Sequence, residues 1–112
     1  MPDLSVASPR GTITISRDVV AEIVTETSAR CYGVVGLSSA SRVGRIFRRE
    51  GVSVGGDAAG IRIELHVVVE YGLNLAEVAA TVRSQVSYEL ERQTGLPVAA
   101  VEVVIQDVRQ TA

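Results

Sequence analysis

The chain contains 112 residues, the length of one domain with a small core, and 46% of them are hydrophobic. Valine occurs 20 times and only four residues are aromatic, so the core is built from branched aliphatic side chains, which favour β-strands. The formal net charge of −2 argues against a general affinity for nucleic acid. One cysteine forms no internal disulfide, and neither a signal peptide nor a bilayer-spanning apolar run of roughly 20 residues is recognisable, so we expect a cytoplasmic protein.

The N-terminal third predicts a strand followed by a helix. Residues 1–10 are polar and flanked by prolines, which is typical of a flexible tail. Thr12–Ile15 alternates between polar and apolar residues, as a short strand does. Ser16 is placed to cap a helix over residues 17–32, because its side chain can accept a hydrogen bond from the first turn. Gly33 then ends this helix.

The middle of the chain predicts a β-hairpin. Val34–Leu37 is an apolar segment that we expect to be buried, whereas residues 38–50 show no regular pattern. Gly51–Val54 and Ile61–Tyr71 both alternate, and a glycine-rich connection joins them. Two alternating runs joined in this way indicate an antiparallel hairpin.

The C-terminal third predicts a helix and a last strand. Asn74 is placed to cap a helix whose apolar residues recur at steps of three and four positions as far as Leu90. Gly95 suits a left-handed helix end, and Pro97 prevents the helix from continuing. Residues 101–105 then alternate again, which indicates a strand.

The predicted order is therefore strand, helix, strand, strand, helix, strand. This order favours an α+β two-layer sandwich, in which two helices pack on one face of a single mixed or antiparallel sheet. The ferredoxin-like arrangement is the default expectation for such an order. We expect one domain over residues 11–108, between an N-terminal tail and a short C-terminal tail over residues 109–112.

Few side chains suggest catalysis. His66 is expected on the polar face of its strand next to Glu64, and no serine, cysteine or aspartate is tied to it by sequence. Cys31 lies near the end of the first predicted helix, where the helix dipole disfavours a thiolate. One cysteine and one histidine do not make a zinc site. We therefore predict no catalytic residue, metal site, cofactor or small-molecule substrate.

An arginine-rich segment is the main candidate for an interaction. Residues 42–50 carry a net charge of +3, whereas the rest of the chain carries −5. As a helix, this segment would form a short amphipathic basic element suited to anionic lipid, phosphate or an acidic partner. A solvated loop with its phenylalanine in the core is the alternative. The candidate residues are Arg42, Arg45, Phe47, Arg48 and Arg49.

Two further features could contact partners. Val68 and Val104 would both point outward from an otherwise polar sheet face, where they could contact a second copy or another protein, or could simply favour strand formation. Residues 33–36 match the GxxG pattern with which KH domains clamp nucleic acid, although their two central valines prefer burial. A KH-like nucleic-acid-binding module that uses this turn and the arginine-rich segment is therefore the alternative hypothesis.

The chain resembles the alkaline shock protein family, the envelope stress response proteins of Gram-positive bacteria. Residues 11–16 (Gly-Thr-Ile-Thr-Ile-Ser) before a helix, followed by Gly33–Leu37, are similar to the opening of that family. Ile61–Tyr71, the helix through Gln85 and the stretch over residues 94–108 look like its later motifs. The resemblance covers residues 11–108 and rests on aliphatic strands and glycine stops.

The resemblance implies a small non-enzymatic protein, with no catalytic or cofactor residues to carry over. It also implies self-assembly into a homo-oligomer and attachment to the inner face of the cytoplasmic membrane through a separate membrane-anchoring protein. The arginine-rich segment corresponds to no fixed motif of the family. We therefore expect a scaffold or adaptor of the envelope stress response, with the KH-like module as the alternative.

Overall fold

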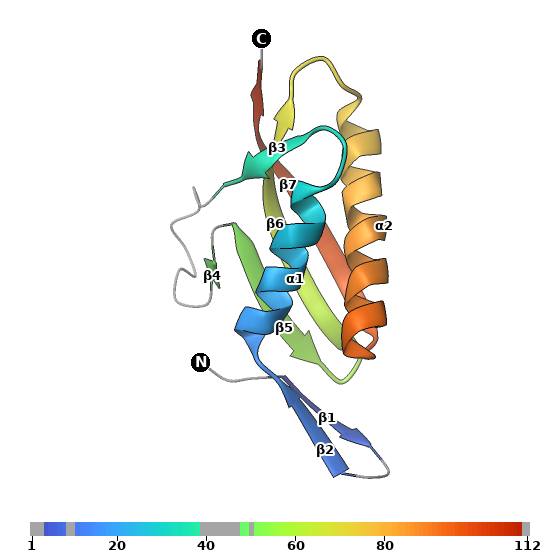
Figure 1. Ribbon diagram of the computed structural model, residues 1–112. Helices are drawn as coiled ribbons and strands as arrows, with labels where there is room; N and C mark the ends of the chain where they lie inside the picture. The colour runs from blue at the N-terminus through green and yellow to red at the C-terminus, as the bar shows by residue number, and fades with distance from the viewer. Residues whose placement is uncertain (1–3, 9–10, 39–47, 50, 111–112) are drawn as a thin grey trace.

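The computed structural model describes residues 4–8, 11–38, 48–49 and 51–110. Both helices lie on the same face of the main sheet, which confirms the predicted α+β two-layer class (Figure 1). The elements in chain order are β1 (Leu4–Ser8), β2 (Gly11–Ile15), α1 (Arg17–Ala29), β3 (Val34–Leu37), β4 (Arg48–Arg49), β5 (Val52–Asp57), β6 (Gly60–Glu70), α2 (Leu75–Thr94) and β7 (Val98–Arg109).

The long strand β6 is the centre of the main sheet. Its first half pairs antiparallel with β5 and its second half with β3, along the same edge, and β4 continues the sheet beyond β5. Its other edge pairs in parallel with β7, from Ile61 opposite Val98 to Glu70 opposite Arg109. The sheet is therefore mixed. A parallel pair needs a crossover connection, and α2 supplies it.

The first predicted strand lies outside this sheet. It forms β2, which pairs antiparallel with β1, and the resulting hairpin projects from one end of the domain (Figure 1). The ferredoxin-like arrangement, which would place this strand inside the main sheet, is therefore wrong. The expected N-terminal tail is wrong for residues 4–8, because they form β1. At the other end, β7 continues to Arg109, the first residue of the expected C-terminal tail.

The predicted helix caps are present. The Ser16 side chain accepts a hydrogen bond from the backbone N–H of Asp18, and the Asn74 side chain accepts one from Glu77. The long helix α2 ends at a left-handed glycine, as predicted. In contrast, α1 ends about one turn earlier than predicted. The backbone N–H groups of Arg30 and Cys31 donate to carbonyls three residues back, which tightens the last turn and redirects the chain.

The core lies between the sheet and the two helices. The inward residues of β6 alternate along the strand as predicted, and Leu65, Val67 and Val69 are fully buried. The buried helix residues that complete this core are Val20, Ala21 and Val24 from α1, and Val78, Val82, Val86 and Leu90 from α2. No helix within the described ranges is long and apolar enough to cross a membrane.

The β5–β6 turn is closed by a polar pair. Arg62 Nε donates to Asp57 Oδ2 at 2.7 Å, and the backbone N–H of Ala59 donates to Asp57 Oδ1 at 2.9 Å. The hydrogen bond from Arg62, followed by the one from Ala59, holds the pKa of the Asp57 carboxyl below its ordinary value. The turn is therefore stabilised by the ionised form of this side chain.

We expect Asp57→Asn to lower the melting temperature slightly at neutral pH and not at low pH. A lowered folded-state pKa contributes stability that is complete above the ordinary value of 3.8 and is lost as pH falls through the folded value. The effect is small because both side chains are about half exposed. The melting temperatures of the two proteins should converge between pH 7 and pH 2, and a constant difference would contradict this assignment.

Candidate interaction surfaces

The arginine-rich segment is described only at its end. Arg42, Arg45 and Phe47 lie outside the described residues. Arg48 and Arg49 form β4, and they pair antiparallel with Ser53 and Val52 of β5. The helical interpretation of this segment is therefore wrong for Arg48 and Arg49, which belong to a short strand at the margin of the sheet.

The Gly33–Gly36 turn does not form an open loop. Residues 34–37 are β3 and pair with β6. A Cβ atom on Gly33 would lie 2.7 Å from Leu73 Cδ1 and 3.1 Å from Val78 Cγ2, so the missing side chain lets the backbone pass close to α2. This glycine therefore has a packing role, whereas a KH-type clamp needs an exposed loop.

Val68 and Val104 lie on the sheet face opposite the helices. Their neighbours Val67 and Val103 pack against the core, whereas Val68 is buried, at 4% exposure, without belonging to that core. Val104 is half-buried and lies opposite His66 in the β6–β7 pair. Val104 therefore offers apolar surface to a partner and Val68 offers little, and a contact through either residue stays a prediction.

His66 lies on the outer face of the sheet beside Glu64, as predicted, but it is buried there. It is 8% exposed, and the Glu64 carboxylate accepts a hydrogen bond from its Nε2 atom at 2.6 Å. Its Nδ1 atom is hydrogen-bonded to the side-chain amide of Gln106, with 2.7 Å between Nδ1 and Oε1. Both ring nitrogens therefore have partners, as a buried imidazole requires.

A β-bulge in β7 places Gln106 beside this histidine. Ile105 lies opposite Val67 and Asp107 lies opposite Val68, so Gln106 is an extra residue on its strand. A bulge redirects a side chain in this way. Sequence reasoning missed the contact, although two adjacent polar residues within an alternating strand are a signal of such a bulge.

We expect Gln106→Ala to lower the free energy of unfolding by about 1 kcal/mol, because it removes a part-buried hydrogen bond of His66 Nδ1. Gln93→Ala is the matched control, since that amide donates to Glu89 on the exposed surface of α2. Chemical denaturation of both variants provides the comparison. Equal losses would show that the His66 contact adds nothing to stability.

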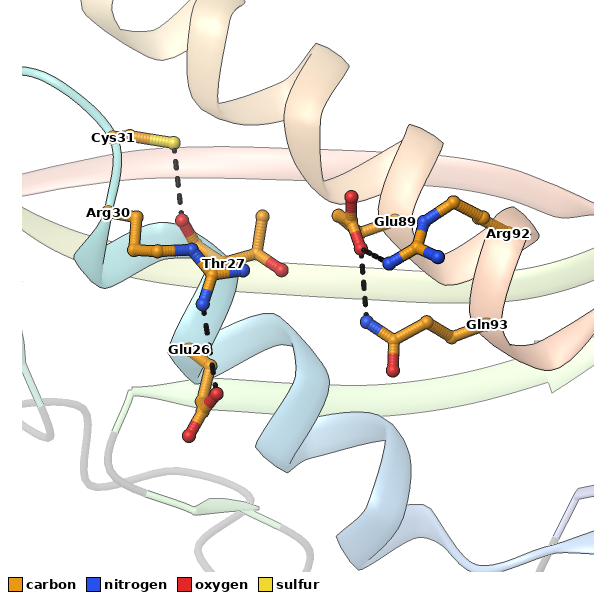
Figure 2. Close-up of polar contacts among 7 residues, drawn as sticks. All are labelled: Glu26, Thr27, Arg30, Cys31, Glu89, Arg92 and Gln93. Carbon is orange, nitrogen blue, oxygen red and sulfur yellow. Dashed lines mark hydrogen bonds and ion pairs between the residues drawn. The ribbon is translucent and has the colours of Figure 1, made fainter.

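The helix face carries a shallow polar groove between α1 and α2. Figure 2 shows Arg30 at the end of α1 and, on α2, Glu89 with its two donors. Arg92 Nη2 donates to Glu89 Oε1 at 2.8 Å and Gln93 Nε2 donates at 3.0 Å, which lowers the pKa of the Glu89 carboxyl. Two open depressions of about 260 and 320 Å³ both include Arg30. The carboxylate in this groove is already satisfied within the protein.

Cys31 lies at the end of this groove and is not activated. Its thiol donates to the backbone oxygen of Thr27 at 3.4 Å (Figure 2). Burial raises the pKa of this thiol, against a smaller opposing effect of Arg30. A raised pKa is the opposite of what a nucleophilic cysteine needs. Across the described residues, no group of three histidine, cysteine, aspartate or glutamate side chains could hold a metal ion.

The strand β7 forms one margin of the main sheet. Within the part of the chain that the structure describes, it pairs only with β6. Its other edge therefore presents backbone N–H and C=O groups that can pair with another strand. This open edge is a surface through which another strand can be bound.

Comparison with known proteins identifies the family of this chain. Residues 5–110 match the alkaline shock protein 23 family, which has a cell envelope-related function. The chain belongs to the alkaline shock protein 23 family. The uncharacterized protein YloU of Bacillus subtilis (strain 168) is 34% identical over 109 residues, which cover 90% of this chain and 91% of YloU. The uncharacterized protein Spy1614 of Streptococcus pyogenes serotype M6 is 33% identical over 107 residues, or 88% of each chain.

Solved structures share the fold of this family member at low sequence identity. A manganese form of a MamM CTD variant has a TM-score of 0.56 and 14% identity, and the match covers 83% of this chain and 96% of that one. A histidine-to-alanine variant of the MamM CTD has a TM-score of 0.58 and 14% identity, with coverage of 80% and 95%. At this identity the likeness shows the fold alone.

Proposed function

We propose that this member of the alkaline shock protein 23 family is a non-enzymatic scaffold or adaptor of the envelope stress response. It acts at the inner face of the cytoplasmic membrane by self-association and by binding a membrane-anchoring protein. The cell envelope-related function of the family supports this role. The observation that carries it is the open edge of β7, because a 12-residue strand that has one neighbouring strand among the described residues can pair with another chain.

We propose that the arginine-rich segment contacts the membrane, through an acidic protein or anionic lipid. Its net charge of +3 stands against −5 on the rest of the chain, so it would orient the protein toward an acidic protein or anionic lipid. Arg42, Arg45, Phe47, Arg48 and Arg49 make this contact in our proposal. Reversing Arg45 and Arg49 to glutamate should then reduce recovery of the protein with membranes, while the fold is retained.

Fractionation of native cells into membrane and soluble pools, with and without nuclease, tests the proposal. The tagged protein is cross-linked before lysis, and its partners are identified from each pool. We expect recovery in the nuclease-resistant membrane pool, attached to a membrane protein. A soluble, nuclease-sensitive complex would contradict the scaffold role and favour a nucleic-acid-binding protein. A strictly monomeric protein with no recoverable partner would contradict both.

A further inference from the structure

We propose that two copies of this chain pair through their β7 strands, in antiparallel orientation, with Val103 of each copy on the two-fold axis. This interface rests on the self-association in the proposed function, and it adds the surface and the register. It would join two main sheets into one continuous sheet with the helices of both copies on the same face.

The backbone hydrogen bonds define which side of β6 faces β7. The N–H group of Ile61 donates to Pro97 O at 2.9 Å, and the N–H group of Tyr71 donates to Arg109 O at 2.7 Å. Successive residues of a strand point their N–H and C=O groups to opposite edges. The odd-numbered residues of β6 therefore bond to β7, and the even-numbered residues face β5 and β3. The bond from the His66 N–H group to Gly51 O agrees with this alternation.

The same geometry defines the open edge of β7. In a parallel pair, the residue directly opposite a bonding residue points its own N–H and C=O groups away from that neighbour. Each odd-numbered residue of β6 from Ile61 to Val69 has such a partner in β7. The residues that present their backbone to the open edge are Val98, Val101, Val103, Ile105 and Val108.

The spacing of these five residues is symmetric about Val103. The intervals between them are three, two, two and three positions, because one bulge follows Val98 and another follows Ile105. A two-fold-related strand therefore places Val103 opposite Val103, Val101 opposite Ile105 and Val98 opposite Val108. In this register the N–H groups of Val101, Val103 and Ile105 meet C=O groups of the other copy, and the two bulges face one another. The N–H groups of Val98 and Val108, at the outer ends, already donate within the chain to Glu91 Oε2 at 3.4 Å and to Asp107 Oδ1 at 2.8 Å, so the three central residues carry the pairing.

The side chains of β7 are also compatible with this antiparallel register. All five outward-bonding residues are aliphatic and lie on the sheet face that packs against the helices, where Val98, Val103 and Ile105 are only partly buried. Residues directly opposite one another in an antiparallel pair point to the same face, so a second copy would cover these exposed portions. On the outer face, Glu102 would lie opposite Val104, and no two like charges would be directly opposite.

The oligomeric state of the wild-type chain and of Val103→Pro tests this interface. We expect light scattering to give twice the 11.9 kDa of one chain for the wild type and a single-chain mass for the variant. Proline removes the Val103 N–H group, which faces the open edge and bonds to no residue within β6, so the fold should survive. The control Val103→Thr keeps the N–H group and the branched shape, and it should stay dimeric.

Disulfide cross-linking in a Cys31→Ala background tests the register, and this test does not depend on whether Val103→Pro folds. Val103→Cys should form an intermolecular disulfide under mild oxidation, because residues opposite in a bonded antiparallel pair lie about 5.5 Å apart between Cα atoms. Ile105→Cys should not, because its two copies would lie about 13 Å apart along the strands. Cross-linking of Ile105→Cys in place of Val103→Cys would overturn the proposed register.

The outcomes separate this interface from the proposed function. A wild-type chain that stays monomeric at all accessible concentrations would overturn both the interface and self-association. An oligomer that survives Val103→Pro and is not cross-linked through Val103→Cys would overturn the β7 interface alone, since the copies would then meet through another surface.

Discussion

Leu65→Ala should lower the free energy of unfolding by about 2–5 kcal/mol. Leu65 has no exposed surface and lies in the middle of β6. This strand pairs directly with β3, β5 and β7, and β4 is joined to it through β5. Truncation removes buried methyl groups and leaves a cavity that the close-packed surroundings fill only partly. Chemical denaturation measures the loss directly, provided that the free energy of unfolding depends on denaturant concentration with the same slope as in the wild type.

Arg62→Ala is the control for this prediction. Arg62 belongs to the same strand but points to the outer face, where its side chain is about half exposed. Its loss should cost no more than about 1 kcal/mol, because exposed ion pairs contribute little. If Arg62→Ala cost more than Leu65→Ala, the assignment of inner and outer faces along β6 would be inverted.

Gly60→Ala should lower the free energy of unfolding by about 2–4 kcal/mol, the second large effect. Gly60 has a φ of 134°, a value that residues with a side chain rarely adopt. An added Cβ atom would lie 2.4 Å from the backbone oxygen of Pro97, which also accepts the first hydrogen bond between β6 and β7. The new methyl group would therefore strain the turn and push the start of β7 away from β6.

Gly72→Ala separates the two contributions to that loss. Gly72 has a positive φ of 97°, but no atom lies within 4 Å of its added Cβ atom. This control should lower the free energy of unfolding by only about 1 kcal/mol, because only the backbone conformation is unfavourable for alanine. Thermal or chemical denaturation of the two variants should show a clearly larger loss for Gly60→Ala. Similar losses would mean that the Pro97 contact relaxes at little cost.

Local signals predicted much of this fold because they depend on neighbouring residues only. Alternation along β6 identified its inner face, since one face of a strand recurs every second residue. Helix caps at Ser16 and Asn74 were recognisable because a cap needs one side chain and the N–H groups of the next turn. For Cys31 the sequence argument used the helix dipole, whereas the structure shows that burial is what raises the pKa of this thiol.

Pairing between distant segments could not be predicted in the same way. Thr12–Ile15 was correctly predicted to be a strand, but its partner is β1 and not the main sheet, and no local pattern distinguishes the two. The hydrogen-bond partner of His66 Nδ1 is Gln106, which lies 40 positions away and is directed there by a bulge. Sequence reasoning therefore placed His66 on the correct face but in the wrong environment.

The sequence by itself determined the two amphipathic helices and the inward row of β6, because periodicity and capping are properties of contiguous residues. Its motifs over residues 11–108 also resembled the family that the chain belongs to. Only the tertiary structure decided that β7 is the margin of the sheet and which of its backbone groups face outward. Those directions depend on the register with β6 and on two bulges, which are set by packing across the sheet. The open edge therefore became visible only when the strands were placed side by side.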